Sequence, residues 1–252
     1  MIQGTKEWAQ DNFAIDIGCE NRCRYCYGRA MAAQYGRQWP ETPTPRSNPT
    51  LPKKGTSVFC FSTHDIVPVN LNRCTEAIKM LLGRGHRVLI VTKPHLDCVR
   101  SICGALRTWR SQVLWRFTIG SADDAILKWW EPGAPCFGER VGSLKASYDA
   151  GYQTSISIEP MLDSKPDDVI CAVDPYVTET IWLGRANKLV QRMSANGWKD
   201  AYSVNSARAL DAMWNDEAVR ALYSRLKHLQ KIRFKDSIRK VVGIPFVQEA
   251  GK

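Results

Sequence analysis

The stretch DIGCENRCRYCYGR, residues 16–29, places three cysteines within eight positions, at Cys19, Cys23 and Cys26. It overlaps the end of the run FAIDIG (13–18), whose alternation of apolar residues is typical of a β-strand. Two tyrosines and three arginines surround the thiols. A dense group of thiols directly after a strand indicates a loop that binds something, and the spacing C-x3-C-x2-C limits what it can bind.

Three kinds of site use cysteines in this way. A structural zinc ion wants four protein ligands, commonly as two separated pairs, whereas the nearest histidine here is His64. A redox dithiol needs only C-x2-C and leaves Cys19 unexplained. An iron–sulfur cube held by three thiolates leaves one iron open for a small molecule. The spacing favours the cube, and we expect the scattered remaining cysteines to be buried apolar residues.

The composition indicates a globular protein. Of 252 residues, 44% are hydrophobic, which is enough for one large core or two small ones. No run approaches the roughly 18 apolar residues of a membrane helix, and the opening MIQGTKEWAQDN lacks the apolar segment of a signal peptide. We therefore expect a soluble, cytoplasmic protein without a membrane partner, whose clustered thiols bind metal instead of forming disulfides.

The charge is strongly basic, at +10 with a pI near 9.2. Between Arg22 and Lys54 seven basic residues face one acidic residue, and between Arg220 and Lys240 eight face one. Such a surface favours polyanions, nucleic acid above all. The alternative is a solvated surface whose charge only keeps the protein soluble.

Strand-like and helix-like runs alternate along the chain, which predicts βαβ units and a parallel sheet. The expected strands are FAIDIG (13–18), SVFCFS (57–62), RVLIVTK (87–93), VLWRFTIG (113–120), TSISIE (154–159) and TIWLG (180–184). The expected helices lie near 24–35, 71–84, 95–108, 139–150 and 165–172. Residues 186–252 form a basic, helical C-terminal part that we expect to pack on the first 185 residues.

Alternation within the strands indicates a barrel. In WRFTIG and TSISIE, bulky apolar residues oppose small or polar ones, and in SVFCFS we expect Phe59 and Phe61 to oppose Cys60 and Ser62. A sheet buried on both faces would be apolar on both. We therefore predict an α/β fold, a partial (β/α)6 TIM-like barrel with a polar lumen. Its site should lie at the carboxyl ends of the strands, near Ser62, Lys93 and Glu159.

C-x3-C-x2-C with an aromatic residue before the last cysteine, after the first strand of a βα-repeat chain, resembles the motif of the radical SAM superfamily. The resemblance implies a [4Fe–4S] cluster on Cys19, Cys23 and Cys26, whose open iron binds S-adenosylmethionine. It also implies an electron donor, such as flavodoxin or ferredoxin. Reductive cleavage of the cofactor would give a 5′-deoxyadenosyl radical that abstracts hydrogen from a substrate.

Within that superfamily the chain is most similar to the spore photoproduct lyase group. CRYCYGR repeats that group's C-x-Y-C-Y, VTKP matches its T-K, RFTIG resembles R-F-S-I-N, and EPGAPCFGER resembles an E-P-x-x-P…R segment. These matches imply that five residues lie beside the cluster or the cofactor. They are Tyr25, Tyr27, Lys93, Thr118 and Arg140.

One departure bears on the reaction. FSTHDIV (61–67) aligns with a C-T-S-D-I-V stretch whose cysteine returns hydrogen to the product in the lyase, and Ser62 stands in its place here. A hydroxyl O–H bond is too strong for that role, which leaves Cys60 as an alternative donor or a reaction that needs no thiol. Three roles are open for His64: it contacts the cofactor, it takes a proton from the substrate, or it forms a loop hydrogen-bond pair with Asp65. Ser62 itself remains a candidate beside the cofactor.

Glu159 and Asp163 follow the fifth expected strand, where they could hold an amine or hydroxyl of a ligand, and Glu159 is the better candidate. In the C-terminal part, Leu222, Leu226, Leu229 and Ile232 follow helical spacing. The cations around them are candidates for gripping phosphates. They are Arg220, Arg225, Lys227, Lys231, Arg233 and Lys235.

The charge, the missing thiol and the lyase-like motifs together indicate hydrogen abstraction from a modified thymine in DNA. Compact enzymes with such a core occur among phage proteins that hypermodify thymine, and one reaction converts an N-linked glycyl-thymine into its C-linked isomer. The expected compartment is then the cytoplasm of a bacterium or a phage-infected cell. Two alternatives stay open: the same chemistry on a peptide or small molecule, and a non-enzymatic metal-binding module that grips nucleic acid.

Overall fold

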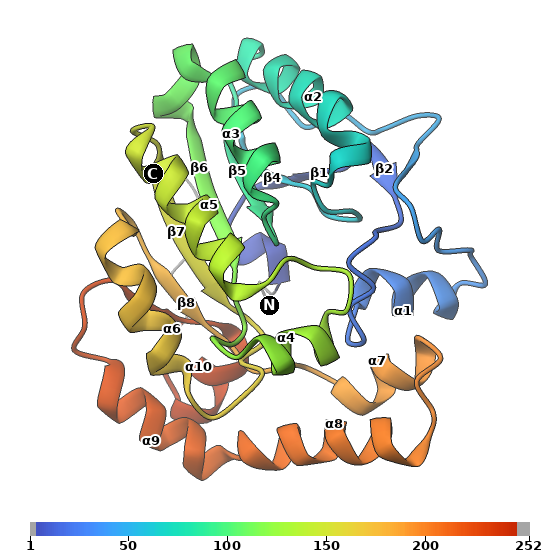
Figure 1. Ribbon diagram of the computed structural model, residues 1–252, viewed down its shortest axis with the longest axis vertical. Helices are drawn as coiled ribbons and strands as arrows, with labels where there is room; N and C mark the ends of the chain where they lie inside the picture. Colours follow the sequence, from blue (N-terminus) through green and yellow to red (C-terminus); the bar gives the residue numbers. More distant parts are fainter. Residues whose placement is uncertain (1–3, 246–252) are drawn as a thin grey trace.

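The computed structural model describes residues 4–245, and seven of its strands form one parallel sheet (Figure 1). Every neighbouring pair of strands is parallel. In spatial order the strands are β1 (Asp11–Phe13), β4 (Ser57–Cys60), β5 (Arg87–Thr92), β6 (Val113–Thr118), β7 (Gln153–Ile158), β8 (Ile181–Leu183) and β9 (Ile232–Phe234). The predicted α/β fold is confirmed, and the sheet stays open between its edges β1 and β9.

Helices that follow the strands cover the outer face of this sheet (Figure 1). They are α2 (Leu71–Gly83), α3 (Leu96–Ala105), α5 (Phe137–Asp149) and α6 (Pro166–Val173). Each buries an apolar stripe, as Ile78, Leu81 and Leu82 do on α2. The structure adds α4 (Asp124–Trp130), which the expected helices did not include although Asp123 caps it through the backbone N–H groups of Ala125 and Ile126.

The cysteine motif lies outside the sheet. A short antiparallel pair, β2 (Asp16–Ile17) and β3 (Thr44–Pro45), precedes and follows it. Between them α1 (Tyr27–Gln34) begins directly after Cys26, within the range 24–35 where a helix was expected.

The C-terminal part contains α7 (Leu189–Ala195), α8 (Ala201–Met213), α9 (Asp216–Leu226) and α10 (Asp236–Val242). The expected helical stripe ends at Leu226, because Leu229 is exposed and Ile232 belongs to β9. A three-residue strand leaves too little alternation to be distinguished from helical spacing. The C-terminal part thus packs on the barrel and also supplies its last strand; its final residues, 246–252, lie outside the described part.

The sheet has apolar residues on both faces. Trp115, Phe117, Ile156 and Ile158 pack in the large core, which includes residues of the outer helices. On the inner face, Trp8, Phe59, Leu89 and Trp182 form a second cluster, and the guanidinium of Arg116 lies 4.6 Å from the Trp8 ring centroid. We call Trp8, Phe59 and Trp182 the aromatic plug.

The predicted faces of β4 were wrong, because Phe59 lies in the inner cluster and Cys60 in the outer core. The run SVFCFS has no contrast between polar and apolar residues at its centre, so either phase of the alternation fits the sequence. In β6 and β7, where Arg116 and Ser155 mark the polar face, the predicted faces are confirmed by the hydrogen bond between these two side chains.

The two ends of the described chain meet between the edge strands. Glu7, at the end of the short 3-10 helix Gly4–Glu7, is fully buried between Lys235 Nζ at 3.1 Å and Arg239 Nη2 at 2.9 Å. These contacts join the segment before β1 to α10 after β9. Within residues 4–245, no helix is long and apolar enough to cross a membrane.

Candidate active site

The cysteine loop, residues 18–26, leaves the short strand β2 through a backbone turn that only glycine tolerates. Gly18 has φ of +96°, and a Cβ there would lie 2.4 Å from the carbonyl oxygen of Pro40. The backbone N–H of Cys19 donates to that same carbonyl at 3.3 Å. At the other end of the loop, Cys26 caps α1 by accepting the Arg29 N–H on Sγ.

The segment between α4 and α5 packs against one side of the cysteine loop. The Arg24 N–H donates to the Trp130 carbonyl at 2.9 Å, and the Gly133 N–H donates to the Asn21 carbonyl at 3.0 Å. A Cβ on Gly133 would lie 2.0 Å from the Glu20 carbonyl oxygen. The two backbones therefore approach more closely than any side chain at position 133 allows.

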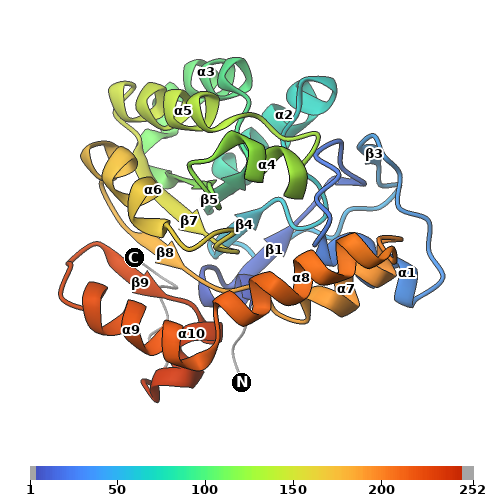
Figure 2. The ribbon, with the colours of Figure 1, turned by 60° about the horizontal axis from the view of Figure 1, so that its bottom comes forward.

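Helix α7 holds the loop from another side (Figure 2), where it packs beside α1. The Asn196 side chain, directly after this helix, donates from Nδ2 to the carbonyls of Arg24 at 2.9 Å and Cys26 at 3.0 Å. The loop that carries the thiols is thus fixed by segments more than 100 residues away in the sequence.

The thiols fit an iron–sulfur cluster better than a single metal ion. Burial raises the pKa of Cys19 to about 12 and that of Cys23 well above its usual value, and coordination to a metal would favour their thiolate forms. In the described residues no three His, Cys, Asp or Glu side chains converge as a mononuclear ion requires. A cube distributes three thiolates over three irons and needs no such convergence.

Beneath the loop, Glu131 joins three of the expected site residues. This fully buried carboxylate accepts the Tyr25 hydroxyl, lies 2.6 Å from Arg140 Nη2 and 3.7 Å from Lys93 Nζ. Burial alone would raise the pKa of Glu131, but Lys93 and Arg140 hold it below its usual value. The carboxylate therefore stays ionised and connects the cysteine loop, β5 and α5.

This arrangement changes the expected role of Arg140. Its side chain is fully buried and also donates to the carbonyls of Pro135 at 2.8 Å and Thr118 at 3.1 Å. The expectation of direct cofactor contact is corrected, because Arg140 positions Glu131 instead. Tyr25 is buried too, whereas Lys93 keeps 14% of its side chain exposed.

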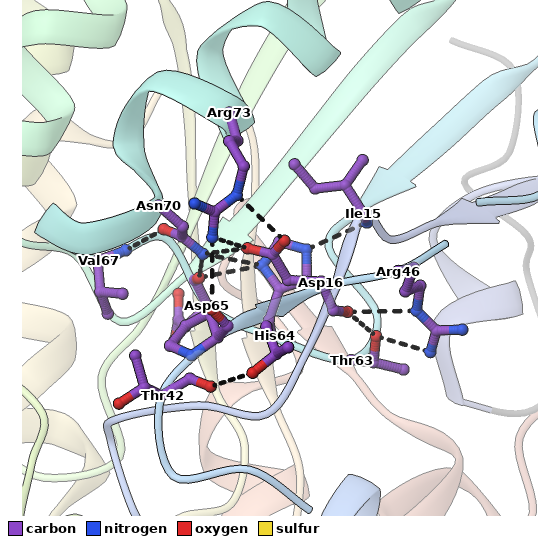
Figure 3. A network of polar contacts seen from close by, with 12 residues as sticks. Ile15, Asp16, Thr42, Arg46, Thr63, His64, Asp65, Val67, Asn70 and Arg73 are labelled. Atoms are coloured by element: carbon purple, nitrogen blue, oxygen red, sulfur yellow. Dashed lines mark hydrogen bonds and ion pairs between the residues drawn. The ribbon is translucent and has the colours of Figure 1, made fainter. Parts of the chain in front are cut away.

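A second polar network surrounds His64 and Asp65 (Figure 3). The Nε2 atom of His64 lies 3.3 Å from the Ile15 N–H, and Nδ1 lies 3.3 Å from Asn70 Nδ2 and 3.1 Å from the Asp65 carbonyl. Burial lowers the pKa of His64, and its ring stacks on Phe61. The catalytic role expected for His64 is corrected, because both ring nitrogens are engaged in the loop.

Asp16 is the fully buried acid of that network, held by Arg73 Nη2 and Asn70 Nδ2 at 3.1 Å each (Figure 3). Asp65 links the network to the site. It accepts Asn21 Nδ2 at 2.7 Å, the Lys93 N–H at 3.1 Å and the Thr92 hydroxyl. The cysteine loop and the end of β5 are therefore tied to one carboxylate.

Two further candidates lie at the carboxyl end of β4. The Tyr27 hydroxyl donates to the Ser62 carbonyl, and Tyr27 remains 43% exposed. Cys60, in contrast, is fully buried and lies near Cys74 of α2. Its expected place in the lumen is corrected, which removes it as a hydrogen donor.

Thr118 ends β6 on the same strand face as Arg116 and is nearly buried.

Glu159 lies at the carboxyl end of β7 with 25% of its side chain exposed, 3.5 Å from Lys235 Nζ. Burial raises its pKa, while Lys235 opposes the shift. Lys235 is only 3% exposed, and its Nζ lies 3.8 Å above the Trp8 ring. The expectation that Lys235 grips phosphates is corrected, because it is committed inside the barrel. Asp163 nearby accepts the Ser121 hydroxyl and the Lys165 N–H.

The other expected phosphate ligands lie on α9 and around β9, across the molecule from α1 in Figures 1 and 2. Arg220, Lys227 and Arg233 are exposed, whereas Arg225 pairs with Asp167 and Lys231 with Asp174. Lys231 precedes β9 and Asp174 precedes β8, so this pair lies at the amino ends of the strands. The site lies at their carboxyl ends.

Three residues near the cysteine loop were not among those expected at the site: Glu131, Asn196, and Arg192, which lies on α7 one turn before Asn196. Glu131 could have been identified from the sequence, because it is the first residue of the E-P-x-x-P…R segment. The positions of Asn196 and Arg192 depend on how α7 packs against α1, for which the sequence carries no local pattern.

The sequence matches no protein-family model and no curated protein sequence. Solved structures, however, share the fold. A variant of spore photoproduct lyase with bound AdoMet and dinucleoside spore photoproduct superposes with a TM-score of 0.56 at 14% identity, over 88% of this chain and 75% of that one. Another variant of the lyase superposes with a TM-score of 0.54 at 16% identity, over 75% of this chain and 61% of that chain.

Streptococcus suis SuiB bound to precursor peptide SuiA superposes with a TM-score of 0.58 at 9% identity, over 96% of this chain and 54% of SuiB. A structure of SuiB bound to S-adenosylmethionine gives the same values. The chain therefore has the fold of spore photoproduct lyase and SuiB. The expected likeness to spore photoproduct lyase is confirmed at the level of the fold.

Proposed function

We propose that this chain is a radical SAM enzyme that binds a [4Fe–4S] cluster and S-adenosylmethionine. The observation that carries the proposal is the position of Cys19, Cys23 and Cys26. All three lie on one clamped loop, in a fold shared with enzymes solved with that cofactor. The loop has three thiols and no fourth ligand, as a cluster with an open iron requires.

The chain's own residues hold this centre in place. The thiols of Cys19, Cys23 and Cys26 would bind three irons, and Asn196 and Gly133 fix their loop. Lys93, oriented by Glu131, is the cation available to a cofactor carboxylate. When bound, the cluster and S-adenosylmethionine supply a carbon radical that abstracts hydrogen. Burial of Tyr25, Glu131 and Arg140 keeps water away from this side of the centre.

For the substrate we propose a modified thymine in DNA that is rearranged, as in a glycyl-thymine isomerisation. The net charge of +10 supports a polyanion, and a structure with the same fold holds a dinucleoside photoproduct. Ser62 replaces the expected thiol, and Cys60 faces the helices. An isomerisation needs no thiol, because the abstracted hydrogen returns to the product.

A peptide substrate is the second candidate. SuiB, which has a similar fold, was solved with a precursor peptide. The exposed cations of α9 are also remote from the carboxyl ends of the strands, which removes one argument for nucleic acid.

The decisive experiment is anaerobic incubation of the reconstituted protein with S-adenosylmethionine, a reductant and DNA that contains glycyl-thymine. We expect turnover that depends on S-adenosylmethionine and the reductant, and a nucleoside of unchanged mass with a shifted retention time. Cys23→Ala should abolish both the iron absorbance and the product. Cys60→Ala is the matched control and should keep both, since Cys60 faces α2.

Other outcomes separate the alternatives. If 5′-deoxyadenosine forms while no nucleoside changes, the chemistry stands and the DNA substrate is wrong, and peptides become the next substrates to test. If zinc fills the thiol site tetrahedrally and no 5′-deoxyadenosine forms, the chain is a metal-binding module and the enzyme proposal fails.

A further inference from the structure

Arg192 lies on the face of α7 that turns toward the cysteine loop. Leu189 and Met193 on the same face are buried at 0% and 1%, and Asn196, one turn further, bonds the loop carbonyls. Arg192 itself is half-buried. Within residues 4–245, its guanidinium makes no hydrogen bond and no ion pair. A half-buried guanidinium without a hydrogen-bond partner in the protein is available to bind an anionic group of a ligand.

The ionisable groups that interact electrostatically with this guanidinium are Glu159, Cys26 and Tyr27. Burial lowers the pKa of Arg192, and these three groups oppose the shift. Arg192 therefore lies between the cysteine loop and the carboxyl end of β7, on the side where a substrate would meet the cofactor.

Glu159 is the last member of a row of alternating charges. Arg239, Glu7, Lys235 and Glu159 follow one another with separations of 2.9, 3.1 and 3.5 Å. The row of ion pairs ends at Glu159. Arg192 interacts with Glu159 electrostatically but forms no ion pair with it. A ligand with one cationic and one anionic group would continue the alternation across this gap.

We propose that Arg192 and Glu159 bind an amino-acid substituent of the substrate, its carboxylate on Arg192 and its amino group on Glu159; this rests on the function proposed above. Arg presents a planar pair of donors that suits a carboxylate. Glu159 lies within range of an amine on the opposite side. A plain thymine would leave Arg192 without an anionic partner and Glu159 with Lys235 alone, which makes Arg192 and Glu159 determinants of substrate choice.

The test is a binding titration with cluster-loaded protein in the absence of S-adenosylmethionine, read by fluorescence anisotropy. The probes are one labelled oligonucleotide with glycyl-thymine, the same oligonucleotide with the glycinamide analogue, and the unmodified strand. Wild-type protein should prefer the carboxylate over the carboxamide by about tenfold or more. Arg192→Gln should reduce this preference to near unity, and Arg192→Lys should keep part of it.

Lys188→Gln is the matched control, since this exposed cation starts the same helix. It should leave the carboxylate preference unchanged. Glu159→Gln should weaken binding of glycyl-thymine and leave the N-acetylated analogue unaffected. If Arg192→Gln instead weakens all three strands equally, Arg192 contacts phosphate and the proposal is wrong. It is equally wrong if the variant changes nothing.

These outcomes are distinguishable from a failure of the proposed function. Loss of iron binding or of 5′-deoxyadenosine formation would refute the enzyme class. Equal binding of carboxylate and carboxamide by wild-type protein, with 5′-deoxyadenosine formation intact, would refute only the role of Arg192 and Glu159.

Discussion

Glu131 shows how much of the site depends on a single buried charge. Its two oxygens contact three donors: Tyr25 of the cysteine loop, Lys93 at the end of β5 and Arg140 of α5. Isolated, any one of these groups would be costly to bury. Together they satisfy one another, and the position of Lys93 depends on the carboxylate behind it.

Neutralising that charge should therefore destabilise the protein strongly. We expect Glu131→Gln to lower the free energy of unfolding by about 3 kcal/mol, because it leaves the buried Arg140 uncompensated. Anaerobic urea unfolding measures the change. Glu76→Gln is the control, since Glu76 is 71% exposed and its pair with Lys79 contributes about 0.5 kcal/mol or less. Equal losses in the two variants would contradict the importance of the buried network.

At the scale of elements, the cysteine loop has little regular structure of its own. Its shape comes from the segments that press on it: the turn before α5, the end of α7 and the β2–β3 pair. Cluster binding is thus a property of several elements and should respond to changes that leave every cysteine intact.

Gly133→Ala tests this dependence directly. The new Cβ would lie 2.0 Å from the Glu20 carbonyl oxygen, so one of the two backbones has to move. We expect iron and sulfide content after anaerobic reconstitution to fall by at least half. Gly138→Ala, in α5, meets nothing within 4 Å and should load normally while gaining up to about 1 kcal/mol of stability. Normal loading of both variants would contradict the proposed clamp.

Five of the six expected strands and most helices could be predicted because their apolar periodicity is local, whereas the expected strand FAIDIG (13–18) was wrong, since its residues divide between β1 and β2 in different sheets. The face of β4 could not be predicted, since its central residues are all apolar, nor could β9, because Ile232 continues the helical spacing of Leu222 and Leu226. The cysteines were recognisable from spacing alone. Arg140, Lys235 and His64 were recognised as polar and then given solvent- or ligand-facing roles, whereas each is buried with partners that only the tertiary fold supplies.

For the whole molecule, charge location matters more than total charge. Helix α9 lies across the molecule from α1 (Figure 2). Two other exposed cations are Arg22, within the cysteine loop, and Arg37, which follows α1. If a nucleic acid enters at the carboxyl ends of the strands, these two cations should contact its phosphates.

We expect Arg22→Gln/Arg37→Gln to weaken DNA binding and to reduce the slope of log affinity against log salt by about 2, one per phosphate contact. Arg220→Gln/Lys227→Gln removes the same charge and should change the slope by less than about 0.5. Titrations between 50 and 200 mM salt, a range chosen from the usual behaviour of such complexes, measure both slopes. The reverse ranking would assign the nucleic-acid surface to α9.

The aromatic plug has a kinetic consequence. Trp8, Phe59 and Trp182 pack together on the inner face of the sheet, so a cofactor and a substrate that bind at the carboxyl ends of the strands would share one entrance. Molecules that share one entrance bind in sequence, and the one bound deepest binds first and is released last. Turnover should then follow a compulsory order of binding, in which the reactant that binds second prevents the release of the first.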